Sequence, residues 1–268
     1  MKKLVIFGDS TTQEYSEKAY PQQGWAHFAK DYFNESIEVI NVGHGGFSLK
    51  SFYYCEKYRK GEIVENIPEQ SEWQHIKEQL NAGDIMVLYW AGINDMLQTG
   101  YDEYREDKNG DFVRDWQNKS KESYIHIGKG MGTHKYFTVT ASVAEYLQLF
   151  TEMVREVQAL GVTTILVQGT GKYYAVCGND KNVISVVREY TRLVEDVAKS
   201  TNSIYLNVGS EFEKEFARIG YEKMMEKYYV PSDNVHYSVT GAKKISELFL
   251  EKLKDSGSEL KQYLRQNV

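Results

Sequence analysis

The chain is poor in the residues that build cross-linked, membrane-spanning or nucleic-acid-binding proteins. It has only 2 cysteines and 3 prolines among 268 residues. Cys55 and Cys177 match no metal-binding or redox spacing, so we expect free thiols in a reducing compartment. No apolar run approaches the length of a transmembrane helix. A net charge of −6 argues against a nucleic-acid or anionic-membrane partner, because both require a basic face.

The start of the chain also lacks the features of a secretory signal. The apolar residues that follow Met1-Lys2-Lys3 are too few, and no small-residue cleavage site comes after them. We therefore expect a cytoplasmic protein. The length of 268 residues fits one α/β domain over 1–268. What the chain has in excess is aromatic residues, with 21 Tyr and 4 Trp, whose rings suit core packing and stacking on sugars.

Short apolar runs alternate with helical patterns along the chain. Strands are predicted at 4–7, 37–42, 84–90, 163–168 and 203–207, and helices at 25–33, 68–80, 139–160, 183–199 and 237–254. Pro68 is expected near the start of its helix, and Gly161 just after the end of another. This alternation predicts an α/β fold, with a parallel sheet covered by helices on both faces. The stretch 98–138 has no clear periodicity but many aromatic residues, which favours an ordered loop excursion over the carboxyl edge of the sheet.

A serine directly follows the first predicted strand, in Gly8-Asp9-Ser10. Open α/β sheets bind ligands at the carboxyl ends of their strands, and the amides of a following helix favour negative charge there. A Gly-Asp-Ser sequence is also an ordinary polar turn, so this segment alone leaves a nucleophile and a plain turn open. Gly46 and Asn94 follow the second and third strands, and a parallel sheet would bring them to the same edge.

Near the C-terminus, Asp233 precedes His236 by three residues. One turn can bring this carboxylate to one imidazole nitrogen, which leaves the other nitrogen to take a proton from Ser10. The amides of Ser10 and Gly46 and the side-chain amide of Asn94 can donate to an oxyanion. Each part has an alternative: a turn at 43–46, a helix cap at Asn94, and a surface pair at Asp233 and His236. Their occurrence together favours catalysis by Ser10, His236 and Asp233.

Four sequence blocks resemble those of the SGNH (GDSL-type) hydrolases: Gly8-Asp9-Ser10, the glycine after the second strand, Gly92-Ile93-Asn94-Asp95 and Asp233-x-x-His236. The resemblance implies a flavodoxin-like, three-layer α/β/α sandwich with a five-stranded parallel sheet. It implies activity as an esterase, lipase, thioesterase or acyltransferase. It also implies that Ser10 is the nucleophile, that Gly46 and Asn94 are oxyanion donors, and that His236 is the base with Asp233 as its partner.

Some features are more similar to the rhamnogalacturonan acetylesterases within this superfamily. These are the Gly-Asp-Ser-Thr start, Gly24-Trp25, and the Asn-x-x-x-x-Gly-x-Ser block from Asn41 to Ser48, which selects Gly46 as the oxyanion glycine. The third block departs from that branch, which more often has Gly-His-Asn-Asp. The resemblance implies a serine esterase that removes acetyl groups from carbohydrate, with pectin-derived oligosaccharides as the expected substrate.

The loops above the sheet edge are expected to set selectivity. Asp9, Thr11, Tyr173 and Tyr174 are predicted to contact the acetylated oligosaccharide. No histidine has metal-ligand spacing, so we expect neither a metal nor a cofactor. Other interpretations stay open: another SGNH esterase, a lipase, an acyltransferase, or a non-catalytic flavodoxin-like module that binds a ligand. The sequence makes no prediction of oligomeric state.

Overall fold

The computed structural model describes residues 1–54, 57–59, 62–65, 71–96, 103–106, 112–115, 125–129, 135–139, 141–176, 179–185, 187–231 and 233–267. Cys55 and Cys177 lie outside the described residues, as does much of 98–138. Among the helices described, none combines the length and the apolar character needed to cross a membrane. The chain divides into two compact units. The first unit is Met1–Gly45, Leu80–Ala91 and Val154–Val268, and the second unit is Gly46–Gln79 and Gly92–Met153.

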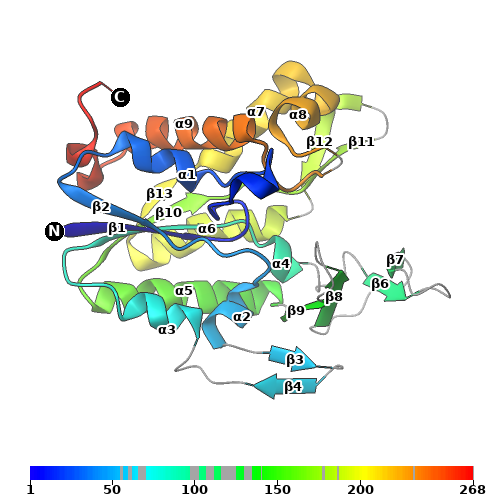
Figure 1. Cartoon of the computed structure of the whole chain (residues 1–268), viewed down its shortest axis with the longest axis horizontal. Helices are drawn as coiled ribbons and strands as arrows, with labels where there is room; N and C mark the ends of the chain where they lie inside the picture. The colour runs from blue at the N-terminus through cyan, green and yellow to red at the C-terminus, as the bar shows by residue number, and fades with distance from the viewer. Residues whose placement is uncertain are drawn as a thin grey trace. The chain divides into compact units, whose positions relative to one another are not determined.

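A five-stranded parallel sheet forms the centre of the first unit, in the order β13–β10–β5–β1–β2 (Figure 1). Its strands are β1 (Lys2–Gly8), β2 (Ile37–Asn41), β5 (Ile85–Trp90), β10 (Thr163–Gln168) and β13 (Ile204–Leu206). Val5 in β1 lies opposite Ile40 and Met86 in its two neighbours. Because central strands of a parallel sheet are covered on both faces, they read as continuous apolar runs. This is why the three central strands, β1, β5 and β10, lie where the sequence predicts them.

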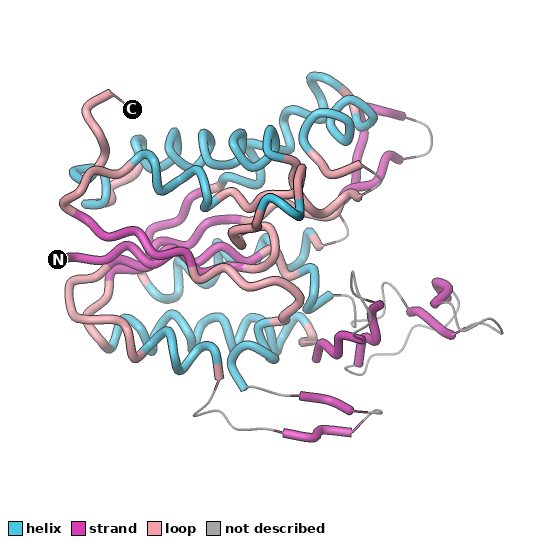
Figure 2. The backbone as a smooth tube through the Cα atoms, in the orientation of Figure 1, coloured by secondary structure: helices cyan, strands magenta, loops and turns pink. Residues whose placement is uncertain are grey.

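Helices cover both faces of this sheet and complete three layers (Figures 1 and 2). One face carries α1 (Ala26–Ala29), α7 (Val208–Ile219), α8 (Tyr221–Tyr228) and α9 (Val239–Asp255). On the other face, α6 (Arg188–Thr201) packs against β10 and β13. The predicted fold class, a three-layer α/β/α sandwich with a five-stranded parallel sheet, is confirmed.

Many of the aromatic residues belong to the core. The Trp25 ring lies 5.3 Å from that of Tyr89 and 5.0 Å from that of Phe249, and its indole nitrogen donates to the Thr12 hydroxyl at 3.1 Å. Trp73 and Trp90 are also no more than 1% exposed. Such rings bury a large apolar area, so much of the aromatic content serves packing rather than contact with a sugar.

The ends of several helices differ from those predicted. Gly161, with φ +80°, follows the end of α5 (Val143–Ala159), as expected. In contrast, α3 (Glu72–Lys77) begins only after Ser71, whose hydroxyl caps it by accepting from the amide of Gln74 at 3.1 Å. Pro68, predicted near its start, lies outside the described residues.

The predicted helix at 183–199 begins later for a different reason. Val183 to Ser185 belong to a strand, β12 (Asn179–Ser185), which pairs antiparallel with β11 (Tyr173–Val176). The sequence analysis also missed α7 and α8. Their apolar residues recur four apart, Phe212 with Phe216 and Met224 with Tyr228, and this helical spacing was a usable signal.

The second unit combines short helices with antiparallel strand pairs. It holds α2 (Leu49–Tyr54), α3, α4 (Ile93–Met96) and the part of α5 up to Met153. Within its described residues, β3 (Lys57–Arg59) pairs with β4 (Glu62–Glu65), β6 (Glu103–Glu106) with β7 (Phe112–Asp115), and β8 (Ile125–Lys129) with β9 (Lys135–Val139). The stretch 98–138 therefore carries short strands where a loop was expected. The sequence did not indicate them because charged residues and glycines interrupt the alternation of apolar and polar residues that is typical of a strand. Its place over the sheet edge and the single-domain organisation stay predictions.

Candidate active site

Ser10 lies in the tight turn that follows β1. The carbonyl of Asp9 accepts hydrogen bonds from the amides of Thr12 and Gln13, at 2.9 and 3.2 Å. Gly8 is required just before this turn, because a Cβ there would lie 2.5 Å from the carbonyl oxygen of Tyr89. The serine is therefore held at the carboxyl end of a central strand, as predicted.

Ser10, His236 and Asp233 are brought together by two hydrogen bonds. His236 Nε2 lies 3.0 Å from Ser10 Oγ, and His236 Nδ1 lies 2.7 Å from Asp233 Oδ2. A carboxylate only accepts hydrogen bonds, so the imidazole carries its proton on Nδ1 and turns a bare Nε2 toward the serine. This is the arrangement in which an imidazole can take a proton from a hydroxyl.

A local turn brings Asp233 and His236 together. Asp233 Oδ1 accepts from the amides of Val235 and His236, at 2.7 and 3.0 Å. Partial burial raises the pKa of Asp233, but this is outweighed by the hydrogen bond from the His236 ring, by the positive charge of that ring when it is protonated, and by the two amides, so that the pKa is lowered overall. The side chains of His236 and Asp233 are 29% and 31% exposed. A small substrate can therefore approach the imidazole from solvent.

Asp9 and Thr11, two predicted substrate contacts, are buried beside the serine. They are 2% and 1% exposed. Asp9 Oδ1 accepts from the amide of Thr11 at 2.9 Å and from its hydroxyl, and Asp9 Oδ2 accepts from the amide of Ala91 at 3.1 Å. Burial raises the pKa of Asp9, although these hydrogen bonds act in the opposite direction. The two residues fix the turn against the end of β5, and their contact with substrate stays a prediction.

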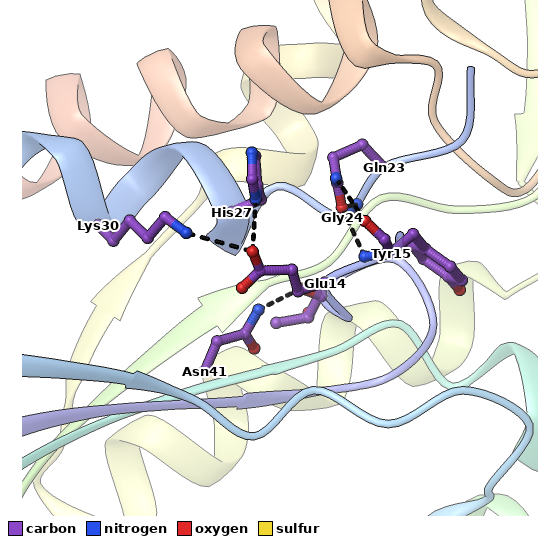
Figure 3. Close-up of polar contacts among 8 residues, drawn as sticks. Glu14, Tyr15, Gln23, Gly24, His27, Lys30 and Asn41 are labelled. Atoms are coloured by element: carbon purple, nitrogen blue, oxygen red, sulfur yellow. Dashed lines mark hydrogen bonds and ion pairs between the residues drawn. The ribbon is translucent and has the colours of Figure 1, made fainter. Parts of the chain in front are cut away.

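The chain after the serine is pinned by side chains that the sequence analysis did not single out (Figure 3). The Tyr15 hydroxyl donates to the carbonyl of Ser10 at 2.9 Å. Gln23 Oε1 accepts from the amides of Tyr15 and Gly24, both at 2.9 Å. Glu14 pairs with His27 on α1 at 2.9 Å. No motif marks these residues, so only the fold reveals their role.

The loop after β2 is held against the same turn. Asn41 Nδ2 donates to the carbonyl of Thr12 at 3.0 Å (Figure 3). The amide of Gly45 donates to Gln13 Oε1 at 2.8 Å, and a Cβ at Gly45 would lie 3.2 Å from the Cβ of Ser10. Gly45 is therefore a glycine whose backbone lies close to the serine.

The two residues predicted to complete the oxyanion site, Gly46 and Asn94, belong to the second unit. Gly46 has a backbone φ of +84°, which residues other than glycine rarely adopt. The space beside it is open, because a Cβ there would meet nothing within 4 Å. Asn94 Nδ2 donates to the carbonyl of Phe47 at 2.9 Å, and Asp95 Oδ1 accepts from the amide of Leu49 at 2.8 Å. These bonds bring the segments of Gly46 and Asn94 together within that unit. Their role as oxyanion donors stays a prediction.

The predicted substrate contact Tyr173 is also buried, with 1% of its surface exposed. Its hydroxyl accepts from the amide of Gly171 at 2.9 Å. Its carbonyl accepts from Asn234 Nδ2 at 2.9 Å and from the Tyr221 hydroxyl at 3.1 Å. Tyr174 belongs to β11, but its side chain lies outside the described residues. The contact of both tyrosines with substrate stays a prediction.

The described part of the chain holds no group of three or more His, Cys, Asp or Glu side chains that could bind a metal ion. The expectation that neither metal nor cofactor is required stays a prediction.

Comparisons with known structures agree with this fold. The chain is similar to the protein YXIM from Bacillus subtilis, with a TM-score of 0.64 and 19% identity over 95% of this chain and 56% of that chain. This chain therefore spans little more than half the length of that protein. It is also similar to an acetylxylan esterase from Geobacillus stearothermophilus, with a TM-score of 0.58 and 18% identity over 99% and 97% of the two chains. An α/β hydrolase from the metagenome of Lake Arreo has a TM-score of 0.56 and 16% identity over 94% and 95%.

At these identities the similar structures show the fold alone. No curated protein matches the chain in sequence. The model of one protein family, described as GDSL-like lipase/acylhydrolase, matches residues 4–249. This range runs from β1 into α9 and contains Ser10, Asp233 and His236. The chain therefore belongs to the GDSL-like lipase/acylhydrolase family of the SGNH hydrolases.

Proposed function

We propose that this hydrolase is a serine esterase that removes acetyl groups from carbohydrate. The observation that carries the proposal is the continuous hydrogen-bonded path from Asp233 through His236 to Ser10. A non-catalytic binding module has no use for this path, whereas a serine esterase uses it to activate its nucleophile. Family membership supports an acyl ester as the substrate.

The first half of the proposed reaction forms an acyl-enzyme. Ser10 Oγ attacks the carbonyl carbon of the ester while its proton moves to His236 Nε2, and Asp233 stabilises the resulting imidazolium. The carbonyl oxygen becomes an oxyanion, for which the amides of Ser10 and Gly46 and Asn94 Nδ2 are the proposed donors. The bond to the alcohol oxygen then breaks. The alcohol leaves with the bonding electron pair and takes the proton from Nε2.

The second half releases the acid. A water molecule gives its proton to His236 Nε2 as its oxygen attacks the acyl carbon. The new oxyanion collapses, the bond to Ser10 Oγ breaks, and Nε2 returns the proton to the serine. The products are the unmodified enzyme and acetic acid, which releases its proton to solvent as acetate, so the reaction needs no oxidant or reductant.

The sugar is proposed on two separate grounds. The Asn-x-x-x-x-Gly-x-Ser block from Asn41 to Ser48 supports pectin-derived oligosaccharides of the rhamnogalacturonan type. The similarity in fold to an acetylxylan esterase favours acetylated xylo-oligosaccharides as a second candidate. A long-chain lipase and an acyltransferase are the alternatives within the same family.

Activity on p-nitrophenyl acetate, together with acetate release from both classes of oligosaccharide, tests this proposal. Ser10→Ala should lower kcat by several orders of magnitude without loss of the folded state, and a serine-directed phosphonate should label the wild type but not the variant. Ser36→Ala, on the exposed segment before β2, is the matched control and should keep full activity. Full activity in Ser10→Ala would contradict the mechanism. Faster hydrolysis of octanoyl than of acetyl esters would favour the lipase.

A further inference from the structure

A hollow of about 550 Å³ is lined in part by Asp233, the acidic residue of the proposed triad. Its lining includes Tyr221, Met225 and Glu226 from α8 and Pro231, Asp233 and Asn234 from the following loop. All of these residues belong to the first unit, as do Ser10 and His236. The volume falls within the range of small-molecule sites, roughly 300–1,000 Å³. The mechanism above uses only Asp233 of this set.

Two of the lining residues are fixed in place by one buried acceptor. The Tyr221 hydroxyl and Asn234 Nδ2 both donate to the carbonyl of Tyr173. The Tyr221 ring also stacks on Phe216, with the planes 22° apart. Because a carbonyl only accepts, the nitrogen of the Asn234 amide must face Tyr173, and Oδ1 is left to accept from another group. These two lining side chains are therefore preorganised, which lowers the entropy cost of binding.

The chemistry of the lining selects a class of ligand. Tyr221, Met225 and Pro231 offer apolar surface, whereas Glu226, Asp233 and Asn234 Oδ1 offer hydrogen-bond acceptors. A sugar ring matches both, since it has C–H faces and hydroxyl donors. An acyl chain would offer no donors to these acceptors, and an anionic group would be repelled by two carboxylates. The hollow thus suits a neutral sugar rather than a uronate or a fatty acyl chain.

The position of the hollow indicates which part of the ester it can bind. The carboxylate of Asp233 is separated from Ser10 Oγ by two hydrogen bonds, of 2.7 and 3.0 Å, and one imidazole ring. His236 Nε2 is the atom that hands a proton to the departing alcohol, so the alcohol part of the substrate lies against the imidazole. We propose that the hollow lined by α8, Pro231, Asp233 and Asn234 binds a neutral sugar ring of the alcohol part, next to the acetylated residue. This inference rests on the proposed function.

The test compares a sugar ester with an ester that is too small to reach the hollow. Values of kcat/KM are measured for a mono-acetylated neutral disaccharide and for ethyl acetate, in the wild type, in Met225→Ala/Glu226→Ala and in the control Glu222→Ala. Glu222 is an exposed carboxylate on the same helix that does not line the hollow, so it matches Glu226. In the double variant, kcat/KM for the sugar ester relative to that for ethyl acetate should fall about tenfold, mainly because KM for the sugar ester rises. A tenfold loss is roughly the contribution of one hydrogen bond and some apolar contact. The control should keep the ratio.

A second measurement uses the deacetylated disaccharide as an inhibitor of ethyl acetate hydrolysis. Its inhibition constant should rise in the double variant, and an otherwise similar disaccharide with a uronate should inhibit the wild type more weakly. An unchanged ratio and an unchanged inhibition constant in the double variant, with a wild type that prefers the sugar ester, would overturn the inference alone. A wild type that hydrolyses neither ester would overturn the proposed function. A wild type that hydrolyses ethyl acetate as well as the sugar ester would overturn the inference together with the proposed substrate class.

Discussion

Replacing Asp233 by asparagine should damage catalysis more than replacing it by alanine. In the native site, Asp233 Oδ1 accepts from the amides of Val235 and His236, and Oδ2 faces His236 Nδ1 at 2.7 Å. Asparagine has one oxygen, and keeping it on the two amides turns its NH2 group toward Nδ1. An NH2 group only donates, so Nδ1 must accept and the imidazole proton moves to Nε2. In that tautomer Nε2 has no lone pair with which to take the proton of Ser10.

The size of the effect follows from this loss of the base. A wrong tautomer in an otherwise intact triad costs about 10⁴ in kcat, or roughly 5 kcal/mol in the transition state. Alanine leaves the imidazole free to adopt the productive tautomer for part of the time, so its loss should be smaller. The assay is kcat for p-nitrophenyl acetate, with the rate of phosphonate labelling of Ser10 as a second readout and thermal unfolding as a control. An Asp233→Asn enzyme within tenfold of the wild type, or faster than Asp233→Ala, would refute this account of the site.

Other perturbations test separate parts of the structure. Asn94→Ala should lower kcat roughly 10²- to 10³-fold with KM nearly unchanged, because the Nδ2 hydrogen that does not bond the Phe47 carbonyl is the proposed donor to the oxyanion. A change in KM alone would make Asn94 a substrate clamp instead. Gly46→Ala should lower the free energy of unfolding by about 1 kcal/mol, since its φ of +84° strains any side chain, and an unchanged unfolding midpoint would contradict this. The hydrogen bond from Arg218 lowers the pKa of Glu215 to about 2 from its usual value of 4.5. The pair therefore adds to the free energy of unfolding above pH 4.5, and this contribution is lost as the pH falls toward 2. The free energy of unfolding in urea should therefore change less between pH 6 and pH 3 in Glu215→Gln than in the wild type. An equal change in both proteins would argue against the Glu215–Arg218 pair. Treatment with a chelator should leave the rate unchanged, and a loss that a divalent ion restores would reveal a metal requirement.

The fold was accessible from the sequence because its signals are local and strong. Each central strand is a short apolar run with a glycine or a polar turn after it, as in Leu4–Phe7 before Gly8. The parallel arrangement follows from the alternation of strands with helices, which leaves few other ways to connect them. The spacing of Asp233 and His236 was equally informative, because one turn fixes the distance between their side chains.

Side-chain direction was the information that the sequence lacked. Successive residues of a strand face opposite sides, and the sequence does not say whether the side of Tyr173 is buried. The structure buries Tyr173 and uses its carbonyl to hold Asn234. The roles of Asp9 and Thr11 were ambiguous for a similar reason, because polar residues beside a nucleophile can either contact the substrate or hold the turn by hydrogen bonds. Their hydrogen bonds could be assigned only once the end of β5 was placed beside them.

The loop from Val230 to His236 joins the chemistry of this enzyme to its proposed selectivity. Val230 donates to the carbonyl of His236 and accepts from the amide of Asp233, both at 3.0 Å, so the loop is closed on itself. Within it, Asp233 orients the imidazole while the next residue, Asn234, is bonded to Tyr173. A substitution in the loop therefore disturbs both functions, and kcat should change along with substrate preference. Met225 lines the same hollow from α8, outside this loop, so substrate preference can vary there while the proposed triad keeps its geometry.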